Sequence, residues 1–254
     1  IALIVGIYER LIRSINSIPL KAPISLIKGD FRKFKNDIKS IDYTFLTPLL
    51  VGIAIATLIL ARFMEYLIDI HAAIAYSFFF GLILASAGTI YIRLDKIDLR
   101  IVLSAVIGFI FAFMTVDLPP IQTNHTLPVI FVSGAIAIVS MILPGISGSF
   151  ILLYLGQYHY MLNALNNFNL IILIVFMIGA IIGLFSFTKG LEYLMKEHKS
   201  GTLAFLFGLM LGALRITVVE VSQESPPLIN VIIPVIIGVV LVVILEYKYQ
   251  KLED

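Results

Sequence analysis

Apolar runs long enough to cross a bilayer recur along the whole chain, and no other feature limits the fold as strongly. About 20 apolar residues span the hydrocarbon core as one helix, whereas a membrane β-barrel would show short alternating segments. With 60% hydrophobic and 13% charged residues, the chain has too few polar side chains to cover a globule of 254 residues. The sequence therefore predicts an all-α integral membrane protein, a polytopic helical bundle. The predicted spans are 45–65, 72–92, 99–116, 170–188, 202–219 and 228–245.

The placement of Lys and Arg predicts how these spans are oriented. Connectors rich in basic residues stay in the cytoplasm. Segment 17–43 carries six Lys and Arg and segment 93–100 carries three, whereas 117–128 and 220–227 carry none. We therefore expect the loop 17–43 and the C-terminus to be cytoplasmic, although this loop could instead lie along anionic lipid. The basic residues outside this pattern are Arg62, expected to be a headgroup anchor, and Arg215.

The chain also aligns with itself in two halves. Residues 1–16 match 151–166, and a second set of identities shares one offset: Gly52 with Gly179, Glu65 with Glu192, Tyr66 with Tyr193, His71 with His198 and Gly81 with Gly208. Segment 65–71 is predicted outside and its match inside, so the repeats are inverted, as in alternating-access transporters. The predicted division is a first repeat at 1–117, an external linker at 118–126 and a second repeat at 127–247. A duplicated channel or an inert scaffold is the alternative.

The segment MILPGISGSF, residues 141–150, interrupts an apolar run. Pro144 removes a backbone donor, while Gly145 and Gly148 permit turns that other residues resist. Non-helical backbone at membrane depth survives only where protein buries it or where it lines a polar cavity, so the break is a candidate binding site. Free amides at Ser147, Gly148 and Ser149 would favour an anion. The alternative is a plain proline kink, and the sequence leaves open whether the segment crosses the membrane or re-enters.

Arg215 is the sharpest candidate among single residues. A cation well inside an apolar span costs about 2.5 to 3.5 kcal/mol on insertion scales, so it needs a partner or a task. Its planar guanidinium suits a phosphate monoester, which the amides near Ser147 could also bind. The alternatives are that Arg215 reaches toward the outer headgroups or pairs with Glu220. Its match in the first repeat is Gly88, so the two halves are chemically unequal.

Several duplicated polar residues are weaker candidates. Glu65 and Glu192 could bind a coupling proton or sodium ion, although a hydrogen-bonding role at a helix end is the favoured interpretation. Tyr8 and Tyr158, each two residues after a glycine, Gly6 or Gly156, could line the site or pack as aromatics. The absence of cysteine excludes a thiolate nucleophile and a thiolate metal site, and no histidine spacing indicates a metal. We therefore expect no metal, no cofactor and no nucleic-acid partner.

Three stretches, 134–158, 1–12 and 205–215, resemble the bacterial polyprenyl-phosphate translocase family, long a domain of unknown function. Members share a twice-occurring Pro-Gly-x-Ser-Gly element followed by an apolar run and Gly-x-Tyr. The second copy is present at 144–148, with Gly156 and Tyr158. The first copy would precede Ile1, which leaves only its Gly6 and Tyr8.

The resemblance implies a flippase rather than an enzyme. Its members are expected to move undecaprenyl phosphate, or a similar polyprenyl phosphate, across the bacterial cytoplasmic membrane, so that the lipid carrier is recycled for cell-envelope synthesis. The expected partners are this lipid and the surrounding membrane lipids, while the oligomeric state is left open. The alternative is a secondary transporter of a small soluble anion. A membrane lipid phosphatase has less support, because no suitable nucleophile or metal motif lies near the break.

Overall fold

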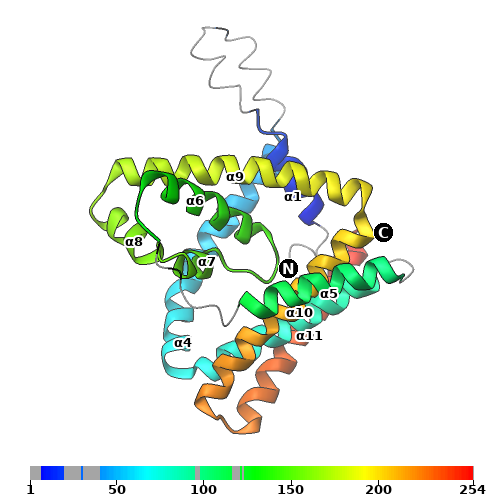
Figure 1. The fold of residues 1–254 in the computed structure, drawn as a ribbon. Helices are drawn as coiled ribbons and strands as arrows, with labels where there is room; N and C mark the ends of the chain where they lie inside the picture. The colour runs from blue at the N-terminus through cyan, green and yellow to red at the C-terminus, as the bar shows by residue number, and fades with distance from the viewer. Residues whose placement is uncertain are drawn as a thin grey trace.

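The computed structural model describes residues 7–19, 30, 41–94, 98–115, 121 and 123–253, without the side chains of 61–62 and 249–253. Within these residues every regular element is a helix (Figure 1). The helices are α1 (Ile7–Asn16), α4 (Tyr43–Ile92), α5 (Leu99–Thr115), α6 (Leu127–Ile142), α7 (Gly148–Tyr154), α8 (Tyr158–Asn166), α9 (Leu170–Glu197), α10 (Lys199–Glu224) and α11 (Leu228–Glu253). Most of the basic loop 17–43, together with Gly6 and Asp117, lies outside the described residues.

Five stretches are long and apolar enough to cross a membrane, which confirms a multi-pass membrane protein. They are Tyr43–Leu60, Phe63–Ile92, Leu170–Glu197, Lys199–Glu224 and Leu228–Lys248, and the shorter apolar helices α5 and α6 accompany them. One predicted boundary is wrong, because α9 continues past 188 to Glu197. Leu191 and Met195 stay buried in its extra turns, so packing favours helix there. Between the spans predicted at 45–65 and 72–92, helix continues up to residue 70, and His71 is the non-helical residue that separates the two.

The two long helical pairs bend at equivalent places. His71 interrupts α4 with φ −139° and ψ 52°, and His198 separates α9 from α10 with φ −135° and ψ 45°. These two histidines are matched residues of the predicted repeat. One non-helical residue at each position therefore bends the chain between two apolar segments without a loop.

Helix α10 lies at the centre of the packing. It contacts both α5 and α4, while α11 packs along α4 and α6 packs along α9. In the most apolar 18-residue stretch of α10, 56% of the residues are buried, compared with 17% in the corresponding stretch of α9. Backbones approach closely at small residues, as membrane helices commonly do: Gly208 lies against the carbonyl group of Ala105, and Gly81 lies against that of Val235. Figure 1 shows α5, α10 and α11 stacked together, with α9 and α6 forming a separate pair.

The first half of α4 is the least covered apolar segment. No residue of Tyr43–Leu60 is buried, and a Cβ atom added to Gly52 would have no contact within 4 Å. At the matched position in α9, a methyl group on Gly179 would overlap the carbonyl oxygen of Phe131 in α6. Matched glycines therefore have opposite environments, and the difference is the presence of α6 beside α9.

Candidate functional site

The predicted break is a real interruption of the helix. Helix α6 ends at Ile142, five residues follow without helical structure, and α7 begins at Gly148. Gly145 has φ +88°, a left-handed conformation that residues with a Cβ rarely adopt, and it lies against the carbonyl of Leu209 and the methyl group of Ala213 in α10. The break therefore rests on the central helix and is not a plain kink within one continuous helix.

After the break the chain folds back toward the start of α6. The backbone amide of Ile121 donates a hydrogen bond to the carbonyl oxygen of Tyr154. The hydroxyl of Thr123 donates one to the carbonyl oxygen of Leu155. Gln157 is fully buried, where its side-chain amide donates to Thr123 and its carbonyl oxygen lies 3.0 Å from Nδ1 of His125. Both ends of the segment made of α6, the break and α7 therefore lie together. Gly156, with φ +65°, makes the turn that joins them.

Tyr8 connects α1 to the break. Its side chain is 5% exposed, and its hydroxyl donates a 3.1 Å hydrogen bond to the carbonyl oxygen of Ile142. Because the last carbonyls of a helix have no partner within the helix, this bond satisfies one of the groups that the break leaves free. The structure thus brings Tyr8 to the predicted site. Tyr158, its match, begins α8 and packs edge-on against His159.

Two hydroxyl groups mark the exposed side of the break. The Oγ atoms of Ser147 and Ser149 lie 2.8 Å apart on exposed side chains, and Ser147 also caps α7 by accepting from the amide of Phe150. Gly148 is buried against Ala137 and Met141 of α6. Helix α7 has only seven residues, so its dipole is short. The hydroxyl pair is therefore the stronger polar feature here.

Arg215 lies on the helix that the break contacts, but it turns toward α5. Its Nη1 donates a 2.9 Å hydrogen bond to the carbonyl of Phe113, and its guanidinium lies 4.2 Å from the centre of the Phe113 ring. Ala213, two residues earlier, touches Gly145. Successive helix residues are 100° apart, so Arg215 and Ala213 point to nearly opposite sides of α10. In this conformation the guanidinium is directed away from the break, although Ala213 of the same helix touches it.

The matched acids Glu65 and Glu192 have different surroundings. Both lie inside helices, so the predicted helix-end role is wrong for each. Glu65 is exposed on α4, whereas Glu192 accepts a hydrogen bond from the side-chain amide of Asn16. The side-chain oxygen of Asn16 accepts a 2.7 Å hydrogen bond from the hydroxyl of Thr188, which is fully buried. The side chain of Arg62 lies outside the described part of the chain.

Some polar residues of this region were not singled out from the sequence. Gln157 occupies the variable position of the Gly-x-Tyr element, and Asn16 was noted only as a repeat match. A polar side chain within an apolar stretch is the signal that could have found both. Among the residues that the structure describes, no group of three or more His, Asp or Glu side chains is placed to hold a metal ion.

Comparisons with known proteins identify the family. The family model described as undecaprenyl phosphate translocase-like matches residues 1–227. A relative from Vibrio cholerae named polyprenyl-phosphate transporter is 40% identical over 84% of this chain and 68% of its own length. A relative of the same name from Staphylococcus aureus is 28% identical over 68% of this chain and 67% of its own length. No solved structure matches the chain. The chain therefore belongs to the undecaprenyl phosphate translocase-like family.

Proposed function

We propose that this protein moves undecaprenyl phosphate, or a similar polyprenyl phosphate, from the outer to the inner leaflet of the bacterial cytoplasmic membrane. The observation that carries the proposal is the break at 143–147, which lies within the stretch that the family model matches and rests against the central helix. The relatives are named for transport of the same lipid class. The proposed activity is transport and not an enzymatic reaction.

In this proposal the break holds the phosphate while the prenyl chain stays in lipid. Ser147 and Ser149 offer hydroxyl donors on the exposed side of the break. Met141 and Leu153, on α6 and α7, are 62% and 44% exposed, which suits a prenyl chain lying alongside. Arg215 joins the site in this proposal only when α10 reorients during transport, because here it faces Phe113 on the side of α10 away from the break. Its guanidinium can then form two parallel hydrogen bonds with the phosphate.

We further propose that the two halves are inverted repeats and that α6, the break and α7 form a re-entrant hairpin. Three observations support this. The chain after α7 bonds back to residues before α6. Matched histidines share one backbone conformation. The packing is also reciprocal, since α5 of one half lies on α10 of the other and α11 lies on α4. Such an arrangement lets equivalent surfaces open to opposite sides of a membrane.

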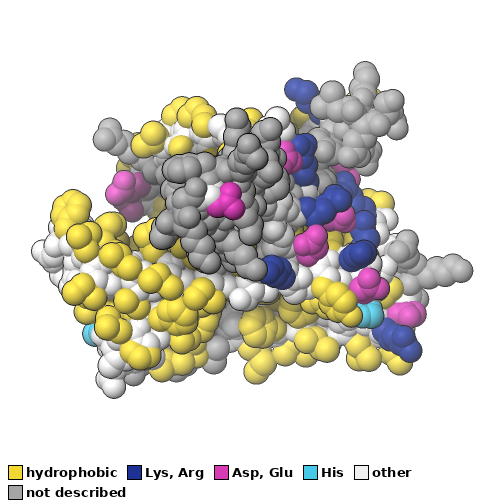
Figure 2. All heavy atoms as spheres, turned by 90° about the horizontal axis from the view of Figure 1, so that it is seen from above, with side chains coloured by type: hydrophobic (Ala, Val, Ile, Leu, Met, Phe, Trp, Pro, Cys, Tyr) yellow, Lys and Arg dark blue, Asp and Glu magenta, His cyan; other side chains and the backbone are white. Residues whose placement is uncertain are grey.

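The proposed orientation places 17–43 and the C-terminus in the cytoplasm. In Figure 2 most of the blue Lys and Arg side chains lie in the right-hand part of the view, whereas hydrophobic side chains cover the left and the lower edge. Proton or sodium coupling through Glu65 and Glu192 stays part of the proposal.

A competition experiment separates this function from transport of a small soluble anion. We expect geranyl phosphate, a short soluble analogue, to inhibit uptake of labelled polyprenyl phosphate into proteoliposomes at concentrations at least about tenfold below inorganic phosphate, because burial of its prenyl group adds roughly 1.4 kcal/mol or more. Equal potency of the two competitors, with uptake of free phosphate, would favour the anion transporter. Release of inorganic phosphate from the lipid would instead indicate a phosphatase.

A further inference from the structure

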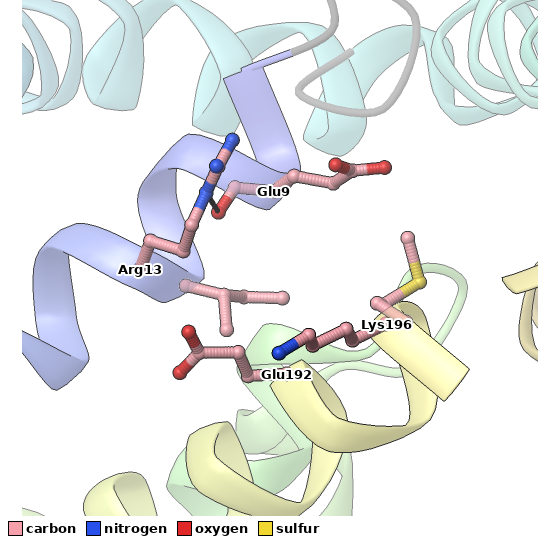
Figure 3. A pocket seen from close by; sticks show the side chains of 6 residues that line it. Glu9, Arg13, Glu192 and Lys196 are labelled. Carbon is pink, nitrogen blue, oxygen red and sulfur yellow. Dashed lines mark hydrogen bonds between the residues drawn. The ribbon is translucent and has the colours of Figure 1, made fainter. Parts of the chain in front are cut away.

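Two adjoining cavities lie beside α1, and Tyr8 lines one of them. The first, of about 350 Å³, is formed by α1 and α9, and the second, of about 440 Å³, also reaches α4 and α10. Glu9 and Met195 line both, so we treat them as one space, the α1–α9 vestibule. Figure 3 shows Glu9 and Arg13 of α1 opposite Glu192 and Lys196 of α9 across the first cavity.

Positive charge dominates the walls of the vestibule. It is lined by four basic side chains and two acidic ones. The basic residues are Arg13, Lys196, Arg93 and Lys199, and the acidic residues are Glu9 and Glu192. The acids are already engaged: Glu9 pairs with Lys199 at 2.8 Å, and Glu192 accepts from Asn16. The walls therefore carry more basic than acidic side chains, which favours an anionic group such as a phosphate monoester.

Tyr8 lies between the vestibule and the end of α6, where the break begins. Tyr8 forms part of the vestibule wall, and the hydroxyl of the same residue bonds to Ile142 at the end of α6. Ile90 and Leu203 add apolar surface to the same cavity. A phosphate leaving the break past Tyr8 would therefore meet cations, and the first prenyl unit attached to it would meet apolar side chains.

We propose that the α1–α9 vestibule is a second phosphate-binding site, which receives the headgroup of the prenyl lipid after it leaves the break. This inference rests on the proposed function for its role but not for its chemistry, since the walls would bind a phosphate group whether or not transport follows. The topology proposed above places the vestibule at the cytoplasmic end, so it is the release site.

A cysteine reporter tests this directly, because the chain has no cysteine of its own. Met195→Cys places a thiol in both cavities. We expect geranyl phosphate to slow the labelling of this thiol by a negatively charged thiosulfonate, and geraniol, which lacks the phosphate, to have little effect. Replacing Lys196 and Lys199 by Gln should raise the concentration of geranyl phosphate needed for half-maximal protection about tenfold. This change is equivalent to the loss of one charge-assisted hydrogen bond.

The matched control replaces Lys189 and Lys248, exposed lysines that do not line the vestibule, and should leave protection unchanged. Equal protection by geraniol, or equal weakening by the control pair, would overturn the proposal. Equal protection by inorganic phosphate would overturn the assignment to a lipid headgroup. If Met195→Cys does not fold, calorimetric binding of geranyl phosphate to the same two lysine pairs in the otherwise unaltered chain decides in the same way.

The outcome is separable from that of the proposed function. Arg215→Ala should stop transport and leave protection of the vestibule thiol unchanged. Protection without any transport by the unaltered chain would contradict the transporter and leave the second site standing. Transport without protection would remove the vestibule alone.

Discussion

Replacing Gly179 by Leu is expected to destabilise the protein by roughly 3 kcal/mol or more, whereas the same change at Gly52 is expected to have little effect. A Cβ at Gly179 would overlap the carbonyl oxygen of Phe131, so α9 and α6 would have to separate along their contact. At Gly52 nothing lies within 4 Å. Both changes gain the same helix propensity, so their difference reports packing alone.

Thermal unfolding in detergent measures this difference. For a chain of this size, 3 kcal/mol corresponds to a fall in Tm of roughly 6 to 12 °C. A similar fall for both variants would show that the first half of α4 is covered by a tight helix contact. No fall for Gly179→Leu would contradict the packing of α6 on α9.

Arg215→Ala is expected to lower transport of polyprenyl phosphate at least about 100-fold, because bonds from a guanidinium to a phosphate contribute roughly 3 kcal/mol. Arg215→Lys should retain part of the activity, since an ammonium keeps the charge but loses the paired donors. The measurement is the initial rate of uptake into proteoliposomes, with unfolding followed on the same preparations.

The control for Arg215 is Phe113→Leu. This variant removes the ring beneath the guanidinium but keeps the carbonyl that accepts from Nη1. We expect transport to stay within about threefold of the unaltered chain. Equal losses of stability and transport in both variants would mean that Arg215 only fastens α10 to α5, and it would then leave the site.

The sequence predicted the helical class and most spans because a membrane requires long apolar segments and a charge bias between connectors. It also located the break, since Pro144 and two glycines close together cannot continue a helix at low cost. The predicted helix limit at 188 was wrong for a physical reason. Polar residues there looked like connectors, but Leu191 and Met195 pack into the core and keep α9 helical.

The direction of side chains could not be read from residue order. The sequence predicted that Arg215 and the amides near Ser147 would bind the same phosphate, yet packing directs Arg215 toward Phe113 on α5. The contact of Tyr8 with Ile142 could not be predicted either, because the two residues are 134 positions apart and meet only once α1 is packed against α9. Asn16 bridges Glu192 and Thr188 because α1 packs beside α9, and residue order alone does not predict that packing.

The central claim is that the break binds the phosphate of a prenyl lipid, and photolabelling tests it most directly. A polyprenyl phosphate with a photoreactive group beside the phosphate would be added to the outer leaflet of membranes that contain the protein. We expect the labelled peptide to include residues 143–149, and geranyl phosphate to suppress this labelling where geraniol does not. Labelling confined to other segments, such as the exposed half of α4, would contradict the account.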